Sequence, residues 1–283
     1  MHYVTDPLQF EFMRRALMAV ALTGITCGLL GSYVVLRGLA FIGDALTHAV
    51  FPGIVIAFAI GRSILLGALV VGLATALGIA TISRGGRVRE DTAIGIVFAG
   101  MFALGVVLVS TLATYQSDVA DLLFGQILGV SSTDLYLAGG AAAVAVGATI
   151  ALNKEFALIG FDRDMAVAMR YPVFMLDLAL LGLLTLAIVV SLQAIGNILV
   201  LAMLVTPAAT ARLLTDRLFS MQIAAAAIGV AGGVVGLYIS FWWNVASGGA
   251  VVLTTTAVFF VVLAATETSR RRRPIQQVAQ TGA

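Results

Sequence analysis

Long apolar runs alternate with short polar segments along this chain, and each run has the length of a membrane-spanning helix. A helix needs about 20 apolar residues to cross the hydrocarbon core of a bilayer. Runs of that length lie near 16–36, 41–60, 63–82, 92–113, 134–152, 172–192, 195–214, 220–240 and 247–266. The pattern therefore predicts an all-α fold, a polytopic integral membrane protein with about nine transmembrane helices.

The composition favours a membrane protein over a water-soluble one. Of the 283 residues, 61% are hydrophobic and only 11% are charged, so a soluble chain would need far too large a core for its polar surface. The first run follows two arginines, as in a signal peptide, but it is long enough to span a bilayer and is predicted to be a retained helix. The formal net charge of +2 is too small to indicate nucleic-acid binding.

Lysine and arginine concentrate in four short segments, and this bias predicts the orientation of the chain. The segments are 83–90, 154–170, 212–217 and 270–273. Cytoplasmic loops of membrane proteins carry an excess of positive charge, so all four are expected inside the cell. We expect a multi-pass protein of the cell (inner or cytoplasmic) membrane, with a cytoplasmic C-terminus and with residues 114–134 facing outward.

The spans are predicted to form a single membrane domain, residues 15–268. Residues 1–14 are expected to form an interfacial segment whose arginines reach the lipid headgroups, and residues 269–283 a disordered cytoplasmic tail. Small residues let membrane helices approach closely. Glycines that suit such packing are Gly24 and Gly28 in the first span and Gly229, Gly232, Gly233 and Gly236 in the eighth.

Two ionisable residues stand one helical turn apart inside an apolar run. The stretch GLAFIGDALTHAVFPG contains Asp44 and His48, which share one stripe of a helix because they are four residues apart. Charged groups inside a membrane are costly and are functional-site candidates by default. A carboxylate and a neutral imidazole suit divalent first-row metals such as zinc, manganese and iron(II). Two ligands do not complete a metal site, so the others must come from another helix, a second copy of the chain or water.

Two other interpretations of this pair stay open. Asp44 is also placed to cap the start of a helix, with His48 as a satisfied buried polar residue. The pair also suits a proton relay within the membrane.

The segment 152–174 is the longest charged stretch between two spans. It also contains apolar residues, which are Phe156, Ile159, Phe161, Met165 and Met169. The mixture is typical of a short helix at the cytoplasmic surface that contacts a partner outside the membrane, although a solvated loop is the alternative. On the opposite side, Asp118, Asp121 and Asp134 have no basic neighbour between them and form a candidate acidic mouth that attracts cations or a basic protein surface.

The seventh span contains candidates for a gating helix. Asn197 lies at its outer end, directly after Gly196, and Thr206 and Pro207 lie further in. Proline lacks a backbone donor, so Pro207 is expected to kink or break this helix.

Several enzyme classes have no counterpart in the sequence. It contains no Walker A motif, no HExxH motif and no Gly-x-Ser-x-Gly motif. The single cysteine excludes an internal disulfide, and two histidines in all exclude a multi-histidine site within one copy. The chain is therefore predicted not to be an enzyme, and any energy for transport must come from another subunit.

Three stretches resemble the permease subunits of the manganese/zinc/iron class of ABC importers. They are LGSYVVLRGLAFIGDALTHAVFPGIVIAF (30–58), LLFGQILGVSSTDL (122–135) and VSLQAIGNILVLAMLVTPAATARLL (190–214). The resemblance extends over roughly residues 10–266. It implies a type II ABC importer permease with eight or nine spans and a second permease copy, identical or related, in the lipid membrane.

The resemblance also implies partners and site residues. Cytoplasmic ABC ATPase subunits would supply the energy and an extracytoplasmic metal-binding protein would deliver the ion, which is the transported substrate and not a permanently bound cofactor. By position in the family motif, Asp44 and His48 are the expected metal contacts. The expected ATPase-coupling segment is about 155–170, and its candidate contacts are Phe161, Arg163, Asp164, Ala168 and Arg170.

Two positions depart from the family pattern. Arg170 stands where relatives usually carry glycine, and Gln126 stands where many carry aspartate. The first departure affects the contact with the ATPase, and the second affects only the outer mouth.

The function predicted from the sequence is ATP-driven import of a divalent transition metal through this permease. One alternative is a self-sufficient, proton-coupled secondary carrier of cations. A second is a type II ABC permease for a metal chelate such as a siderophore or a corrinoid. A structural membrane subunit without transport would leave the Asp and His unexplained.

Overall fold

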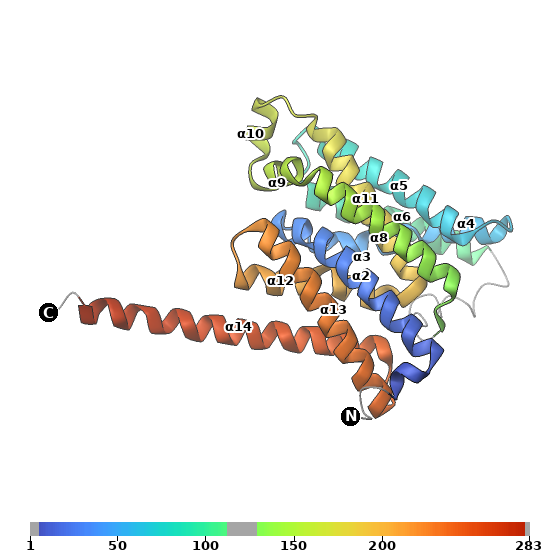
Figure 1. The fold of residues 1–283 in the computed structure, drawn as a ribbon. Helices are drawn as coiled ribbons and strands as arrows, with labels where there is room; N and C mark the ends of the chain where they lie inside the picture. The colour runs from blue at the N-terminus through green and yellow to red at the C-terminus, as the bar shows by residue number, and fades with distance from the viewer. Residues whose placement is uncertain (1–5, 112–128, 281–283) are drawn as a thin grey trace.

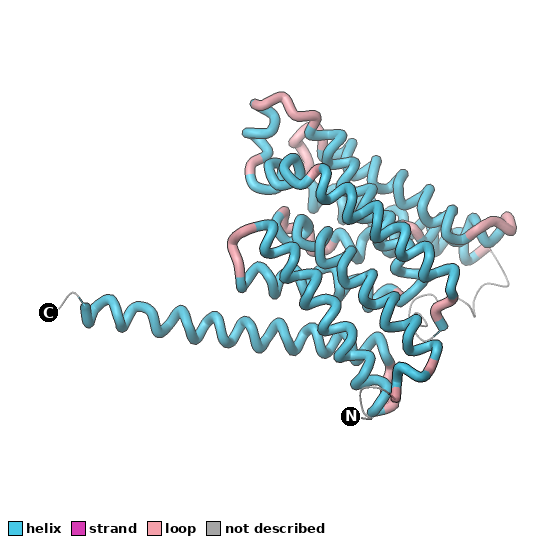
Figure 2. The backbone as a smooth tube through the Cα atoms, in the orientation of Figure 1, coloured by secondary structure: helices cyan, strands magenta, loops and turns pink. Residues whose placement is uncertain are grey.

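The computed structural model describes residues 6–111 and 129–280, and within them the chain is a bundle of α-helices. Figure 2 shows helices joined by short loops, with no strand among the described residues. The elements are η1 (Pro7–Gln9), α2 (Glu11–Leu36), α3 (Ile42–Ala49), α4 (Phe51–Ala59), α5 (Ile64–Ser83), α6 (Glu90–Ser110), α8 (Ser132–Ala151), α9 (Asn153–Phe161), α10 (Arg163–Ala168), α11 (Val173–Ile195), α12 (Asn197–Leu214), α13 (Leu218–Trp243) and α14 (Ser247–Gln280).

The predicted number of spans is confirmed for the part of the chain that the structure describes. Nine helical stretches there are long and apolar enough to cross a membrane. One of them, Ile42–Ala59, is made of two helices, α3 and α4, that meet at Val50. The sequence predicted one span near 41–60 and gave no break within it. The break has a local cause, because Pro52 has no N–H to donate to the carbonyl of His48 four residues earlier.

Long helices reach close to both ends of the described residues. Helix α2 begins at Glu11 and includes Arg14 and Arg15, and Arg15 forms an ion pair with Glu11 one turn earlier. At the other end, the backbone of α14 stays helical to Gln280; the interfacial role of residues 1–14 and the disorder of residues 269–283 stay predictions. Extending an existing helix costs much less than starting one, because the unfavourable nucleation step is already complete. Figure 1 shows α14 projecting from the bundle as a long rod.

Helix α2 packs closely against α13 through glycines in the two spans for which the sequence predicted close packing; which spans pack together was not predicted. A Cβ on Gly28 would lie 2.7 Å from the backbone nitrogen of Ala226, and one on Gly24 would lie 2.9 Å from that of Val230. A Cβ on Gly233 would overlap Val20 on the first span. The absence of side chains on both helices therefore lets the two backbones touch.

The loops that the sequence predicted to be cytoplasmic lie toward one end of the bundle. In Figure 1, α9, α10, the turn between α12 and α13 and the far end of α14 lie on the left, whereas the α4–α5 turn lies on the right. This arrangement agrees with the alternation of loops that the positive charges predicted.

Helices α11 and α12 are separated by the single residue Gly196. Its φ of 84° lies in the region that favours glycine. Helix α12 then continues across Pro207 to Leu214. Of the predicted kink or break at this proline, the break is therefore wrong. Helix α2 packs closely against α12 just before this proline. A Cβ on Gly31 of α2 would overlap the carbonyl oxygen of Leu204.

Candidate functional site

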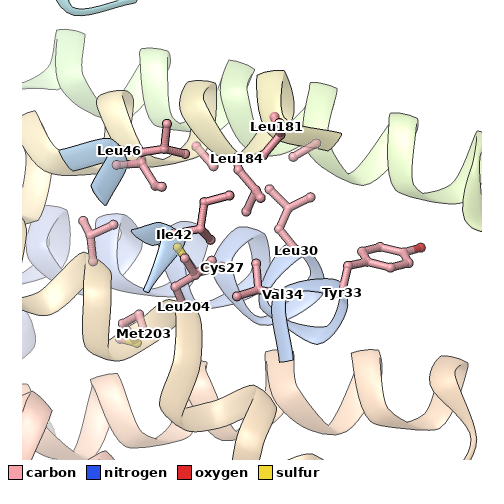
Figure 3. Close-up of a cluster of buried hydrophobic side chains, with 14 of the residues drawn as sticks. Cys27, Leu30, Tyr33, Val34, Ile42, Leu46, Leu181, Leu184, Met203 and Leu204 are labelled. Atoms are coloured by element: carbon pink, nitrogen blue, oxygen red, sulfur yellow. The ribbon is translucent and has the colours of Figure 1, made fainter. Parts of the chain in front are cut away.

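Helix α3 has one face in the core and another that carries its ionisable residues. Ile42 and Leu46 are fully buried, and Figure 3 shows them among Cys27 of α2, Leu184 of α11 and other apolar side chains. The hydroxyl of Thr47 donates to the carbonyl oxygen of Gly43 at 2.7 Å, so this polar group is satisfied within the helix. Burial of the apolar face fixes the rotation of α3 and thereby the direction of its polar stripe.

Asp44 and His48 lie on that polar stripe and approach each other; together they are called the Asp–His pair below. The imidazole Nε2 of His48 is 3.4 Å from Oδ1 of Asp44. The side chain of Asp44 is 38% exposed and that of His48 is 24% exposed. The predicted shared face of the two residues is therefore what the structure has, and it opens toward the surface of this single chain.

An aromatic wall on α6 borders the imidazole. The ring centroid of His48 is 5.3 Å from that of Phe102, edge-on, and 5.8 Å from that of Phe98. The two phenyl rings stack on each other with centroids 6.1 Å apart. Their apolar surface limits water on one side of the Asp–His pair and leaves the other side for a ligand.

The Asp–His pair alone cannot complete the coordination of a transition metal. Zinc takes four ligands in its usual sites. Within the described residues, no group of three or more His, Cys, Asp or Glu side chains is close enough to hold a metal ion. A metal at this pair therefore needs further ligands from water or from another chain. The arrangement suits transient binding better than permanent storage, because conduction requires a site that an ion can leave.

A second group of charges, which the sequence analysis missed, lies between α2, α6, α10 and α11; we call it the buried ion cluster. It consists of Arg37, Glu90, Asp177 and Arg163. The guanidinium of Arg37 donates to Glu90 at 2.9 Å and to Asp177 at 2.7 Å. Arg163 donates to the other carboxylate oxygen of Asp177 at 2.5 Å. The side chains of Arg37 and Asp177 are only 7% and 5% exposed.

A signal for this cluster was present in the sequence. Asp177 is a lone acid near the start of the apolar run 172–192, and an ionisable residue in a span is a functional candidate by default. The pairing itself was not visible, because Arg37 and Asp177 are 140 residues apart in the chain.

The predicted coupling segment forms two short helices, α9 and α10, at one end of the bundle (Figure 1). The carboxylate of Asp162 accepts a hydrogen bond from the backbone N–H of Met165 at 2.8 Å and caps the start of α10. The apolar residues of the segment divide into two sets. Phe156 and Ile159 are buried in the core, whereas Phe161, Met165 and Met169 are exposed.

The five predicted coupling residues differ in their surroundings. Phe161, Asp164, Ala168 and Arg170 are exposed, and they share the segment's outer surface with its exposed apolar side chains. Arg163 is 41% exposed and reaches inward to Asp177. The segment therefore has a free surface of mixed character and one anchored arginine.

Arg170 has an unusual backbone for a residue that is not glycine. Its φ is +60°, the left-handed region. The backbone N–H of Tyr171 donates to Ala166 at 3.0 Å, and that of Arg170 donates to Val167 at 2.9 Å. This pattern is a Schellman motif, in which glycine usually fills the left-handed position. The expected departure from glycine therefore falls where glycine would be favoured.

Among the described residues, no hydrogen bond, ion pair or ring contact joins the predicted gating residues to the Asp–His pair. Asn197 is buried at the start of α12, and its side-chain oxygen has no hydrogen-bond partner among the described residues. Pro207 is buried within α12, and the carbonyl oxygen of Thr206 accepts a hydrogen bond from Thr210 at 2.7 Å. Their role in gating stays a prediction.

The predicted acidic mouth is only partly within the described residues. Asp118, Asp121 and Gln126 lie outside them. Asp134 forms a capping box with Ser131: its carboxylate accepts from the backbone N–H of Ser131 at 3.0 Å, and its own N–H donates to Ser131 Oγ at 3.1 Å. Asp134 therefore stabilises the start of α8, and its carboxylate already accepts hydrogen bonds within the capping box.

The described residues form nine candidate membrane spans, and one broken span carries an ionisable pair. This combination is typical of a membrane permease. The chain belongs to the ABC 3 transport family, whose model matches residues 9–266. It is thus a permease subunit of an ABC transporter, a type of subunit that is not itself the ATPase. The predicted family and membrane fold are confirmed.

Curated relatives cover most of the chain. The manganese transport system membrane protein MntC of Halalkalibacterium halodurans is 44% identical over 240 residues, which are 85% of this chain and 82% of that protein. The chelated iron transport system membrane protein YfeD of Yersinia pestis is 41% identical over 238 residues, 84% of this chain and 80% of that protein.

Solved structures share the fold. The structure titled PsaBC from Streptococcus pneumoniae in complex with Fab matches with a TM-score of 0.80 and 37% identity, covering 92% of this chain and 94% of that one. An inward-facing conformation of a putative metal-chelate type ABC transporter matches with a TM-score of 0.70 at 17% identity, covering 92% and 88%. The second likeness concerns the fold alone.

Proposed function

We propose that this chain is the membrane permease of an ATP-driven importer that moves a divalent transition metal, with the Asp–His pair as a transient site on the path. The observation that carries the proposal is the 3.4 Å approach of His48 Nε2 to Asp44 on one face of a spanning helix. Their ligand types suit manganese, zinc and iron(II). Relatives above 40% identity are named for manganese and for chelated iron.

A second permease copy, identical or related, covers the Asp–His pair in this proposal. Asp44 is 38% exposed in the isolated chain although it belongs to a stretch of spanning length. Asp44 lies in the first turn of α3, and a carboxylate facing lipid costs up to roughly 2.5–3.5 kcal/mol by insertion scales, the value for the centre of a spanning helix. A polar path between two copies removes this cost and supplies the missing ligands. The transported metal is the substrate, and no permanently bound cofactor is required.

The coupling segment is the proposed docking surface for the cytoplasmic ATPase subunits. Its exposed apolar side chains, among them Phe161, Met165 and Met169, resemble the apolar core of a protein interface. Exposed Asp164 and Arg170 would form the polar rim. Ala168 is small enough to allow close approach. The same end of the bundle then faces the cytoplasm, together with the C-terminus, and an extracytoplasmic binding protein delivers the metal at the other end.

Uptake of radioactive manganese or zinc tests the site. Cells that express the importer with Asp44→Ala or His48→Ala should lose uptake at least about tenfold, since even an outer-shell partner is worth roughly 10–100-fold to a metal site. Thr47→Ala is the matched control: its hydroxyl bonds to Gly43 within the same helix and faces no ligand. Expression is checked by immunoblot. Wild-type uptake in both variants would show that Asp44 and His48 do not form the transient metal site.

Reconstitution separates the proposal from its two rivals. A secondary carrier would transport under an ion gradient in liposomes that contain the purified chain alone, whereas an ABC permease needs the ATPase subunits. A permease for a metal chelate would keep its transport when Asp44 is replaced by Asn. Transport of the free ion that needs ATP and is lost in Asp44→Asn supports import of the metal itself.

A further inference from the structure

We propose that the ion pair between Arg163 and Asp177 is the switch through which the coupling segment controls the Asp–His pair, an inference that rests on the proposed function. Arg163 belongs to α10, on the surface where the ATPase is proposed to dock. Asp177 belongs to α11 and is buried. The pair therefore joins the outside of the bundle to the buried ion cluster.

One connection from the cluster leads to the helix of the Asp–His pair. Arg37 is the C-terminal cap of α2, and the chain turns there through Gly38, whose φ is +70°. The N–H of Leu39 donates back to Val34 at 2.9 Å, and the N–H of Ile42 donates to Leu39 at 2.9 Å. This hydrogen-bonded turn leads directly into α3. A displacement of the Arg37 backbone is therefore passed to the start of α3.

A second connection leads to the other side of the imidazole. Glu90, which accepts from Arg37, is the first residue of α6. Phe98 and Phe102 lie further along the same helix and contact the ring of His48. A helix moves as a rigid rod over such a length, so a shift of Glu90 moves the aromatic wall. The start of α3 and the aromatic wall on α6 are thus both connected to the buried ion cluster.

The charge balance of the buried ion cluster distinguishes two states of the ion pair between Arg163 and Asp177. With Arg163 engaged, two arginines face two carboxylates and the cluster is neutral. With Arg163 withdrawn, Arg37 alone remains between two acids, and one negative charge is left over beside a buried Asp177. An uncompensated buried charge is strongly unfavourable. Withdrawal of Arg163 therefore requires free energy from outside the cluster. It also forces Arg37, Glu90 and Asp177 to rearrange.

Arg163 also has space into which it can move. It lines a cavity of about 500 Å³ together with Arg84, Tyr171 and Phe174. Part of that wall is already cationic, with the Arg84 guanidinium 4.8 Å from the ring centroid of Phe174. Arg163 is much more exposed than the carboxylate that it binds, 41% against 5%. A surface arginine on a buried acid, next to open volume, suits a contact that is made and broken during transport.

The test measures metal transported per ATP hydrolysed, using the permease assembled with its ATPase subunits and binding protein in proteoliposomes. Arg163→Met keeps an unbranched apolar stem and removes the charged guanidinium, and should lower the ratio of manganese moved to ATP hydrolysed about tenfold, within the usual range of coupling between sites. Arg163→Lys retains a charge that can reach Asp177 and should recover most of the ratio. Arg212→Met is the matched control, because Arg212 pairs only loosely with exposed Asp216, at 3.7 Å.

The outcomes separate this inference from the proposed function. Loss of the ratio in Arg163→Met, with recovery in Arg163→Lys and with normal copurification of the ATPase, supports the switch. An unchanged ratio in Arg163→Met overturns it. Loss of ATPase copurification overturns it as well, because Arg163 would then act in docking. If the unaltered assembly moves no metal with ATP, the proposed function itself fails.

Discussion

Arg170 is strained by its backbone, and this makes one residue of the coupling segment a target for a stability test. A side chain in the left-handed region costs roughly 1–2 kcal/mol relative to the right-handed one, a cost that glycine avoids. The surrounding motif nevertheless forms, with both of its reverse hydrogen bonds in place. The packing of α9 and α10 therefore holds Arg170 in a conformation that it does not prefer by itself.

Arg170→Gly should stabilise the end of α10. We expect a gain of up to about 1 kcal/mol, since glycine adopts this φ freely but loses more backbone entropy on folding. Thermal unfolding of the detergent-solubilised protein measures the change. Arg62→Gly is the matched control, because Arg62 is an exposed loop arginine whose φ is not positive, and it should be neutral or destabilising. A lower midpoint for Arg170→Gly than for Arg62→Gly would contradict the expected strain.

Single residues were predictable from the sequence when their partner lay within one helical turn. The spacing of Asp44 and His48 predicted their common face, and the structure has them 3.4 Å apart. The partner of Asp177 could not be predicted from spacing along the chain. Arg37 comes from a different span, and the contact depends on tertiary packing.

At the scale of the helices, the contact between α2 and α13 depends on the absence of side chains. The Cβ positions of Gly24 and Gly28 would meet backbone atoms of α13, not the ends of flexible side chains. Backbone atoms cannot turn away, so an added methyl group must separate the helices. Some glycines of the bundle have no such neighbour: around Gly78 of α5 there is nothing within 4 Å of a Cβ.

Gly28→Ala should therefore destabilise the bundle. We expect a loss of roughly 1–3 kcal/mol, as for overpacked cores. Gly78→Ala is the matched change, and it should be neutral or stabilising by up to about 1 kcal/mol, because alanine has the higher helix propensity. Thermal unfolding in detergent compares the two variants. Equal midpoints would mean that α2 and α13 can separate at no cost.

The helix boundaries show which local signals outweigh others. Length and apolar composition were enough to predict the nine spans. Proline was a weaker guide: Pro52 lies in the first turn of α4, just after a break, whereas Pro207, for which a kink or a break was predicted, lies within a continuous helix. The effect of a proline depends on whether neighbouring helices hold the chain on both sides of it, and this is a tertiary property.

For the whole molecule, the arrangement of loops at two ends predicts which residues can be reached from outside the cell. Arg62 lies in the exposed α4–α5 turn and Arg217 lies in the exposed α12–α13 turn, toward opposite ends of the bundle in Figure 1. The natural Cys27 is buried and is not expected to react. Two single substitutions can therefore report on orientation.

A membrane-impermeant maleimide should label Arg62→Cys in intact cells and leave Arg217→Cys unlabelled. Both variants are made in a Cys27→Ser background, and labelling after the cells are opened serves as the control for reactivity. The physical reason is the positive-inside bias of the loops, which assigns the α12–α13 turn to the cytoplasm. Labelling of Arg217→Cys and not of Arg62→Cys in intact cells would reverse the assigned orientation.

The buried ion cluster has a consequence for how the chain is made. Arg37 and Asp177 are 140 residues apart, and at roughly 5–20 residues per second the ribosome needs on the order of 10 s to synthesise that stretch. During this time four further candidate spans of the described residues are synthesised, and Glu90 is the one acid of the cluster that Arg37 can pair with. The first half of the permease therefore reaches its final packing late, when α11 has been synthesised and Asp177 can pair with Arg37 at the end of α2.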